Sequence, residues 1–285
     1  MAVTSACKSV VRNLLKQIWG LRAAGLRNRI LYYHSIHPTM PLSTHPAVFE
    51  QHIIHAKELG YRIITHRQIT RATCSADESP WLALGFDDGY EDNHDFARPV
   101  LERHGVRATF FVVAGQIRQG NEYPDAGYQL YPNRRMLSQP QVGSLARAGH
   151  EIASHGLQHE LATAVVKAGR DLAAEYVASR QMLSSWAGEE VTSYSYPNGQ
   201  NGAYSAETRA ATIAAGFKTG SVTKWGTVKR DSDLFTLPRC EVAAEDTTAD
   251  LIKKITGKED YLHLAHRIRR SPTWKPSEPG HAHSI

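Results

Sequence analysis

The feature that most constrains the fold of this chain is the alternation, from Arg29 onward, of short apolar runs with longer amphipathic segments. Runs rich in β-branched and aromatic residues, such as ILYYHSI at 30–36 and WLALGF at 81–86, are typical of buried strands. The segments between them, such as AVFEQHIIHAKEL at 47–59, carry apolar residues at helical intervals. Repeated β-then-α order predicts an α/β fold with a parallel sheet, and this many units in one chain favour a barrel or a doubly wound sheet.

The same patterns continue along the chain. We expect strands at 30–36, 61–65, 81–86, 107–115, 150–155, 191–197, 217–223 and 234–242. We expect helices at 47–59, 90–105, 138–148, 168–187, 203–216 and 250–257. Pro99 should bend or break the second of these helices. The polar stretch 118–135 follows a strand end, where substrate-binding loops usually lie.

Composition excludes some classes of protein. The 33 Lys+Arg against 28 Asp+Glu give a net charge of +5, and the excess lies near the two ends rather than in basic blocks with interleaved aromatics. We therefore expect no nucleic-acid binding. The 3 cysteines are too few for a disulfide framework or a thiolate zinc site.

The two ends differ from the middle of the chain. In 1–28, Arg12, Lys16 and Arg22 interrupt every apolar run, so we expect neither a signal peptide nor a membrane span, and a cytoplasmic location. The spacing predicts an amphipathic helix that packs on the domain or a partner; peripheral contact with an anionic membrane is the alternative. Residues 263–285 read as a basic and Pro-rich tail, which leaves 29–262 as a single domain.

An acidic pair follows one of the predicted strands. Asp87-Asp88-Gly89 comes directly after WLALGF, and the carboxyl ends of strands are where α/β folds place their active sites. Two adjacent carboxylates repel each other, and a bound cation removes that repulsion. The alternative is an ordinary acidic turn.

A histidine pair follows another strand. His155 and His159 are the only two of the 15 histidines spaced as HxxxH, a spacing that puts both rings on one face of a helix. Chance alone predicts about one such pair in a chain like this, so the pair by itself is weak evidence. Together with Asp88 it forms an N₂O ligand set that leaves a fourth position for water. Asp87 would then be free to act as a base.

Two later motifs also lie near strand ends. The turn that contains Tyr196 and Pro197 can aim a backbone N–H at a developing oxyanion, although Pro and Gly make it a turn in any case. Arg239, in LPRCEV, is either catalytic or an ordinary ion-paired arginine.

These segments resemble a known family. The run LGFDDGYEDNHDFARPVLERHGVRATFFVVAGQI at 84–117 is similar to the first motif of the polysaccharide deacetylases, the NodB-like carbohydrate esterases, and HEIASHGLQH at 150–159 is similar to the second. ILYYHSI and the following VFEQHIIHAKELGYRIIT resemble the branch that includes poly-N-acetylglucosamine deacetylases. YPNG and LPRCEV resemble its third motif and its late Arg motif. The resemblance spans about residues 29–257.

The resemblance implies a single catalytic domain, folded as a distorted (β/α) barrel of the NodB type, that removes N-acetyl groups from saccharides. The implied cofactor is a divalent metal, commonly Zn²⁺, with Co²⁺, Ni²⁺ and Mn²⁺ as alternatives. By matching position, Asp87 would be the general base, Asp88, His155 and His159 the metal ligands, and Arg239 the residue that orients Asp87. The oxyanion would be held by the metal and a backbone N–H near Tyr196.

The chain departs from the family pattern in three places. Ser195 stands where many members have Arg, and Gly156 stands where the second motif has Ser or Thr. The late Leu-x-His motif that supplies the general acid has no clear counterpart. The candidates are His34, at the end of the first strand, and His263 and His266, in a basic amphipathic segment.

Two other functions are consistent with parts of this pattern. One is a deacetylase-like protein that binds carbohydrate but has lost catalysis; the missing acid motif favours it, and the second carboxylate, Asp87, argues against it. The other is a sugar-nucleotide transferase that uses its aspartates to hold a Mg²⁺-diphosphate. Histidine ligands suit zinc-like ions better than Mg²⁺, and no Gly-rich phosphate loop is present. Release of acetate distinguishes the deacetylase from both.

Overall fold

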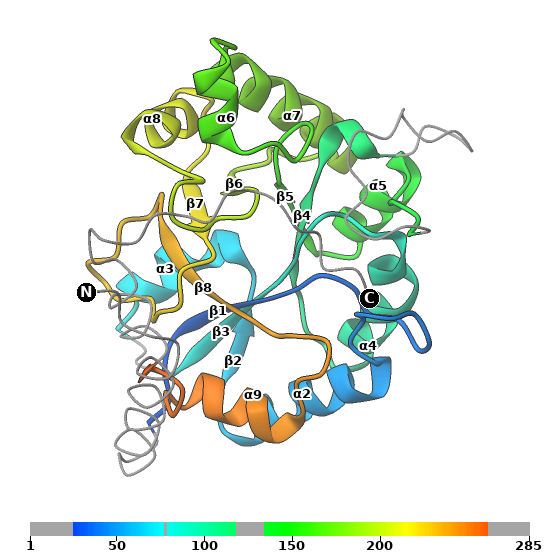
Figure 1. The fold of residues 1–285 in the computed structure, drawn as a ribbon. Coiled ribbons are helices and arrows are strands. Elements are labelled where there is room, and N and C mark those ends of the chain that lie inside the picture. Colours follow the sequence, from blue (N-terminus) through cyan, green and yellow to red (C-terminus); the bar gives the residue numbers. More distant parts are fainter. Residues whose placement is uncertain (1–24, 77–78, 118–133, 262–285) are drawn as a thin grey trace, which may run out of the picture.

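The computed structural model describes residues 25–76, 79–117 and 134–261, which form one barrel-like layer of strands surrounded by helices (Figure 1). Each of the eight predicted strands is confirmed, most of them shorter than expected. The strands are β1 (Arg29–Tyr33), β2 (Arg62–Ile64), β3 (Trp81–Phe86), β4 (Thr109–Val112), β5 (Glu151–Ser154), β6 (Ser193–Ser195), β7 (Thr219–Val222) and β8 (Leu237–Glu241).

The sheet closes on itself. The strand order is β1-β8-β7-β6-β5-β4-β3-β2, every strand pairing is parallel, and β1 also pairs with β3. Since β1 occupies one edge of β3, both β2 and β4 lie on the other edge, β2 beside Trp81–Ala83 and β4 beside Gly85–Phe86. The result is a closed ring of seven strands with β2 appended, which confirms a distorted (β/α) barrel and excludes the doubly wound sheet.

Helices surround the ring, with α2 and α9 side by side on one flank (Figure 1). The α-helices are α2 (Pro46–Glu58), α3 (Ile69–Cys74), α4 (Arg98–Arg103), α5 (Gln139–Arg147), α6 (Ala162–Lys167), α7 (Leu172–Ala187), α8 (Ala206–Ala214) and α9 (Thr248–Ile255). Short 3₁₀ turns lie at His66–Gln68 and Ala114–Gln116. Neither α3 nor α6 was predicted, because each is a single short segment without a clear amphipathic pattern.

The helix predicted at 90–105 is divided into two parts. A π-helical turn at Asn93–Ala97 runs into α4, and Pro99 lies in the first turn of α4. Pro99 has no N–H to donate to the carbonyl of Asp95, so the α-helical hydrogen-bond ladder cannot continue through this point. The proline therefore changes the helix type and does not end the helix.

Side chains alternate between the two faces of each strand, and this alternation separates two apolar clusters. On β1, Leu31 and Tyr33 pack outward in the large core between ring and helices. Ile30 precedes Leu31, so its side chain lies on the other face of the strand, in a smaller cluster with Ile69, Trp81 and Leu237 among its members. Apolar side chains therefore fill the amino end of the ring beside β1, β3 and β8. A buried, hydrogen-bonded polar group lies at the amino ends of β4 to β7 and consists of Thr109, Glu151, Ser193 and Thr219, together with His66.

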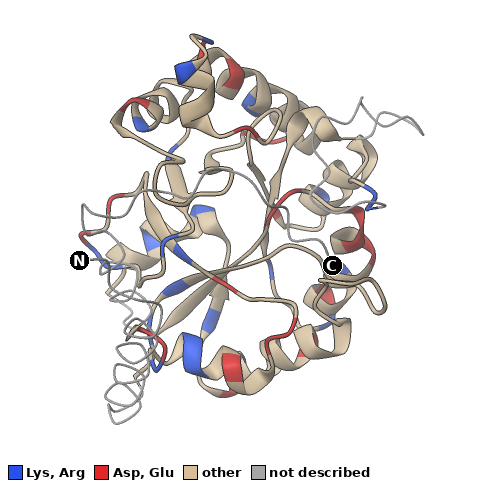
Figure 2. Cartoon of the chain, viewed as in Figure 1, with Lys and Arg blue, Asp and Glu red and all other residues tan. Residues whose placement is uncertain are grey.

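Acidic and basic residues are interspersed over the outer helices in the view of Figure 2. Among residues 25–76, 79–117 and 134–261, no helix has both the length and the apolar character needed to cross a bilayer. The amphipathic helix predicted in 1–28 falls almost entirely outside the described residues, as does the tail at 263–285 with His263 and His266. Of the insertion predicted at 118–135, only Arg134 and Arg135 are described.

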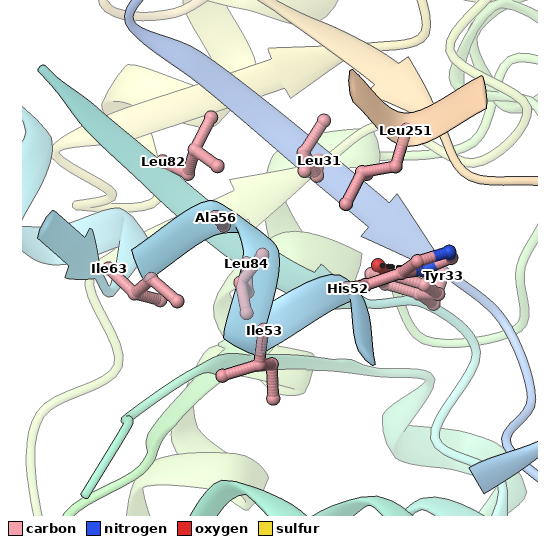
Figure 3. A pocket seen from close by; sticks show the side chains of 9 residues that line it. All are labelled: Leu31, Tyr33, His52, Ile53, Ala56, Ile63, Leu82, Leu84 and Leu251. Atoms are coloured by element: carbon pink, nitrogen blue, oxygen red, sulfur yellow. Dashed lines mark hydrogen bonds between the residues drawn. The ribbon is translucent and has the colours of Figure 1, made fainter. Parts of the chain in front are cut away.

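The outer core is tightly packed. Figure 3 shows the side chains around a cavity of about 10 Å³ between β1, β3, α2 and α9. The lining is apolar apart from Tyr33 and His52, which hydrogen-bond to each other at 3.1 Å. A volume of about 10–15 Å³ holds a single water molecule at most, so this layer contains little unused space.

Leu82 is fully buried beside this cavity, so the substitution Leu82→Ala should lower the free energy of unfolding by about 2–5 kcal/mol. Urea unfolding followed by circular dichroism measures this loss. Leu59→Ala is the control, since the Leu59 side chain is 37% exposed and should lose much less. Equal losses at the two positions would contradict the packing described here.

Candidate metal centre

The loop after β3 carries the two predicted aspartates. The N–H of Asp87 still bonds to the carbonyl of Tyr33, at 2.9 Å, as a continuation of the sheet. The backbone then turns sharply, with φ of 74° at Asp88 and 82° at Gly89. A left-handed backbone is unfavourable for a residue with a side chain and persists where the surroundings fix it, often at functional sites. The turn presents two adjacent carboxylates at the carboxyl end of the strand.

The loop after β5 carries the two predicted histidines. His155 directly follows β5, but the segment to His159 is an irregular loop, with φ of 84° at Gly156 and 58° at His159. The prediction that the two rings share a helix face is therefore wrong. The left-handed residues fold the loop back on itself, and this brings the two rings to 4.8 Å between centroids.

The 3₁₀ turn at Ala114–Gln116 supports the loop at 155–159, which we call the histidine loop, through two backbone hydrogen bonds. The N–H of Ala114 bonds to the carbonyl of Gly156 at 3.1 Å, and that of Gly115 bonds to the carbonyl of Leu157 at 2.8 Å. A Cβ at position 115 would lie 2.5 Å from the Leu157 carbonyl oxygen. Only glycine allows this close approach, and sequence reasoning missed Gly115 because its role depends on a neighbouring strand.

Asp88, His155 and His159 meet in one buried cluster. Oδ1 of Asp88 lies 3.5 Å from Nε2 of His155 and 3.3 Å from Nε2 of His159. The three ligand atoms lie within 4.8 Å of one another. Two ligands of a tetrahedral zinc ion, each bonded at 2.0–2.1 Å, are separated by about 3.3 Å. The spacing therefore fits a divalent ion bound by all three side chains.

Two further observations support the fit to a metal. Neither carboxylate oxygen of Asp88 has a hydrogen-bond partner among the described residues, although the side chain is buried. Nδ1 of His155 donates to the carbonyl of Ser195 at 2.9 Å, which leaves its Nε2 lone pair directed at the cluster. Burial lowers the pKa of His155 to about 4, so the ring is neutral at pH 7, as a metal ligand must be.

Asp87 has a different partner from Asp88. Arg239, on β8, donates from Nη1 and Nη2 to the two carboxylate oxygens of Asp87, at 2.7 and 2.8 Å. The guanidinium lies over the rings of Tyr32 and Phe111, with its carbon 4.3 and 5.3 Å from their centroids. Burial alone would raise the pKa of Asp87, but the surrounding groups, Arg239 foremost among them, together hold this pKa below the ordinary value. Asp87 is therefore an ionised carboxylate beside the cluster.

His34 lies at the same rim. It follows Tyr33, the last residue of β1, and its partly exposed ring contacts the ring of Tyr32 edge-on at 5.5 Å. Nδ1 of His34 lies 4.0 Å from a carboxylate oxygen of Glu241. Of the three histidines considered as proton donor, His34 is the one within the described residues.

Tyr196 and Pro197 occupy the turn after β6, but neither can donate a backbone N–H to a ligand. The N–H of Tyr196 bonds to the carbonyl of Ser221 at 3.0 Å, and its buried hydroxyl bonds to Thr212. Proline has no N–H. These two residues therefore contribute to the site by packing, since Pro197 lies beside Gly156 of the histidine loop.

Comparison with known proteins gives one consistent result. The model of the family described as "Polysaccharide deacetylase" matches residues 75–220, just over half of the chain. A Bacillus subtilis (strain 168) protein, YxkH, whose name describes it as a candidate polysaccharide deacetylase, is 27% identical over 217 residues, 75% of this chain and 71% of that protein.

Solved structures share the fold. The Streptococcus pyogenes deacetylase PplD, in complex with acetate, superposes with a TM-score of 0.67 at 21% identity, over 81% of this chain and 99% of that chain. A de-N-acetylase from Aggregatibacter actinomycetemcomitans gives a TM-score of 0.62 at 18% identity, over 79% and 98%.

The support behind the histidine loop can be tested by the substitution Gly115→Ala. The added methyl group must displace the Leu157 carbonyl, so the variant should bind Zn²⁺ at least about tenfold more weakly, as loss of a ligand-orienting contact typically does. Isothermal titration of the metal-free protein with Zn²⁺ measures this change. Gly25→Ala, where a Cβ meets only ordinary contacts, should bind Zn²⁺ as the unchanged protein does. Unaltered affinity in Gly115→Ala would show that the turn does not hold the ligands.

Proposed function

Because this chain belongs to the polysaccharide deacetylase family, we propose that it is a divalent-metal-dependent hydrolase that removes N-acetyl groups from amino sugars of a polysaccharide, oligosaccharide or glycan precursor. The observation that carries the proposal is that two neighbouring aspartates have different partners. Asp88 shares a cluster with His155 and His159, and Asp87 is paired with Arg239. A site that only bound metal would not need the second carboxylate.

The proposed ligands are Asp88, His155 and His159, and two nitrogens with one oxygen favour Zn²⁺ over Mg²⁺, with Co²⁺, Ni²⁺ and Mn²⁺ as alternatives. A divalent ion bound there would lower the pKa of water and polarise the acyl oxygen. These three side chains leave further coordination positions for water and substrate.

The remaining residues supply proton transfer. Asp87 is the proposed general base, and it takes one proton from the attacking water. Arg239 keeps the Asp87 carboxylate ionised and fixed in orientation through two hydrogen bonds. The water oxygen bonds to the acetyl carbon, the C–N bond breaks, and a proton passes to the departing nitrogen, which gives acetate and a free amine. We assign the last proton to His34, since it lies at the same rim and is partly exposed.

The substrate class rests on the relatives. The family description specifies polysaccharides, one structural neighbour was solved with acetate and another is called a de-N-acetylase. We therefore propose an N-acetylated hexosamine unit as the group recognised. The turn that contains Tyr196 and Pro197 lies beside the histidine loop, and we propose that it lines the part of the site where the oxyanion forms.

The substitution Asp87→Asn should abolish release of acetate from N-acetylglucosamine oligomers, because an amide cannot accept the proton. The bound Zn²⁺, measured by elemental analysis of the same preparation, should remain, since Asp87 is not a proposed ligand. Full activity in Asp87→Asn would show that the base is another group.

The substitution His155→Ala should instead lose both the Zn²⁺ and the activity. His55→Ala, on the outer side of α2, is the matched control and should retain both. A protein that keeps its Zn²⁺ but releases no acetate from any N-acetylated saccharide would support the carbohydrate-binding alternative.

A further inference from the structure

Two residues at the start of the π-helical turn hold the backbone around His34. The side-chain amide of Asn93 donates to the carbonyl of His34 at 2.7 Å. The hydroxyl of Ser35 donates to Oδ2 of Asp92 at 2.5 Å. The loop that carries Asp87 and the segment that carries His34 are therefore joined by side chains as well as by the sheet.

Arg134 adds a third segment to this connection. Its side chain is almost fully buried, and Nη1 donates to Oδ2 of Asp92 at 3.2 Å. Nη2 donates to the carbonyl of Pro41 at 2.6 Å and to the hydroxyl of Ser43 at 3.0 Å. The guanidinium carbon lies 5.3 Å from the centroid of the Tyr90 ring. A single guanidinium thus connects the loop after β3 with residues 41–43 of the loop after β1.

The residue between those two contacts has an unfavourable backbone. Leu42 has a φ of 56°, in the left-handed region, and 61% of it is exposed. Its own side chain gains little from burial, so the surroundings must hold this conformation. Arg134 bonds to the residue on each side of it, and the loop base is closed by bonds from His37 to Thr44 and from Thr44 to Ser35.

The hydrogen bonds of Arg134 given above lead to the loops after β1 and β3, whereas the proposed ligands His155 and His159 lie on the loop after β5. Through Asp92, Arg134 is two hydrogen bonds away from Ser35, the neighbour of His34. These bonds therefore link the segment that carries His34 with the loop that carries Asp87.

We propose that Arg134 is a positioning residue for the reaction: through Asp92 and Ser35 it holds the segment that carries His34 at the rim, and through Pro41 and Ser43 it holds the loop that follows this segment. This inference rests on the proposed function, in which His34 donates the proton to the departing amine. Sequence patterns alone do not single out Arg134, because its partners lie about 40 and 90 residues earlier in the chain.

A double-mutant cycle tests whether Arg134 acts through His34. Arg134→Met should lower kcat for acetate release by about 10- to 100-fold, with KM and bound Zn²⁺ little changed. His34→Ala should lower kcat as well, and the double variant should be no slower than His34→Ala, because the group that Arg134 positions is already absent. Additive losses, or loss of Zn²⁺ in Arg134→Met, would overturn the proposal and assign Arg134 a general structural role.

Hydrogen exchange provides a measurement that does not depend on activity. The amide hydrogens of residues 35–44 should exchange faster in Arg134→Met than in the unchanged protein, while those of β5 and β6 should not. Arg135→Met is the matched control, since Arg135 is the next residue, is largely exposed and pairs with Glu91 at 3.2 Å. It should change neither exchange nor kcat. Unchanged exchange in residues 35–44 of Arg134→Met would overturn the proposal.

Arg134→Lys covers the case in which Arg134→Met does not fold. Lysine keeps a positive charge beside Asp92, but its single nitrogen cannot replace the two guanidinium nitrogens that make the three hydrogen bonds. Arg134→Lys should therefore lose less kcat than Arg134→Met. Its loss should likewise not add to that of His34→Ala. A kcat equal to that of the unchanged protein would contradict the role of the bonds to Pro41 and Ser43. If the unchanged protein itself releases no acetate, the proposed function fails, and the exchange experiment alone decides whether Arg134 holds the loop.

Discussion

The buried ion pair between Asp87 and Arg239 underlies the arrangement of this site. Two adjacent carboxylates at one strand end repel each other, and burial makes the repulsion stronger. Arg239 satisfies one carboxylate with two hydrogen bonds. Asp88 is then the aspartate nearer the histidines, with Nε2 of His155 3.5 Å from Asp88 and 3.9 Å from Asp87. Removing one partner of such a pair usually costs about 3–5 kcal/mol, because a charge is left buried without compensation. The pair therefore serves both the stability of the barrel and the separation of the proposed base, Asp87, from the proposed ligand, Asp88.

Closure of the barrel makes this pair geometrically feasible. Asp87 and Arg239 are 152 positions apart in the chain, and they meet because β1 pairs with β3 on one side and with β8 on the other. Parallel pairing brings the carboxyl ends of β3, β5 and β8 to one rim. Asp87 and Arg239 are both buried, so the attraction between their charges is stronger than it would be in water.

Residue patterns predicted a large part of this. Strands such as β1, β3 and β4 could be placed because each lies in a short apolar run bounded by turn residues. Asp88, His155 and His159 could be grouped because all three follow predicted strands. The helix expected between the two histidines does not form, since His159 adopts a left-handed backbone that HxxxH spacing cannot reveal. The roles of Gly115 and Arg134 depend on contacts between loops, for which the local pattern carries no signal.

The sequence by itself determined the order of strands and helices, the parallel sheet and the residues placed at the strand ends. These features follow from the spacing of apolar residues and from the residue types that form turns, which are local properties of the chain. The tertiary structure shows that the ring closes and that Arg239 binds Asp87, two features that the family resemblance implies but no local pattern predicts. It alone decided that the backbone N–H of Tyr196 is used in strand pairing. Those outcomes depend on which strands become neighbours. Neighbour choice is set by burial and packing summed over the whole chain, and no short stretch of residues contains it.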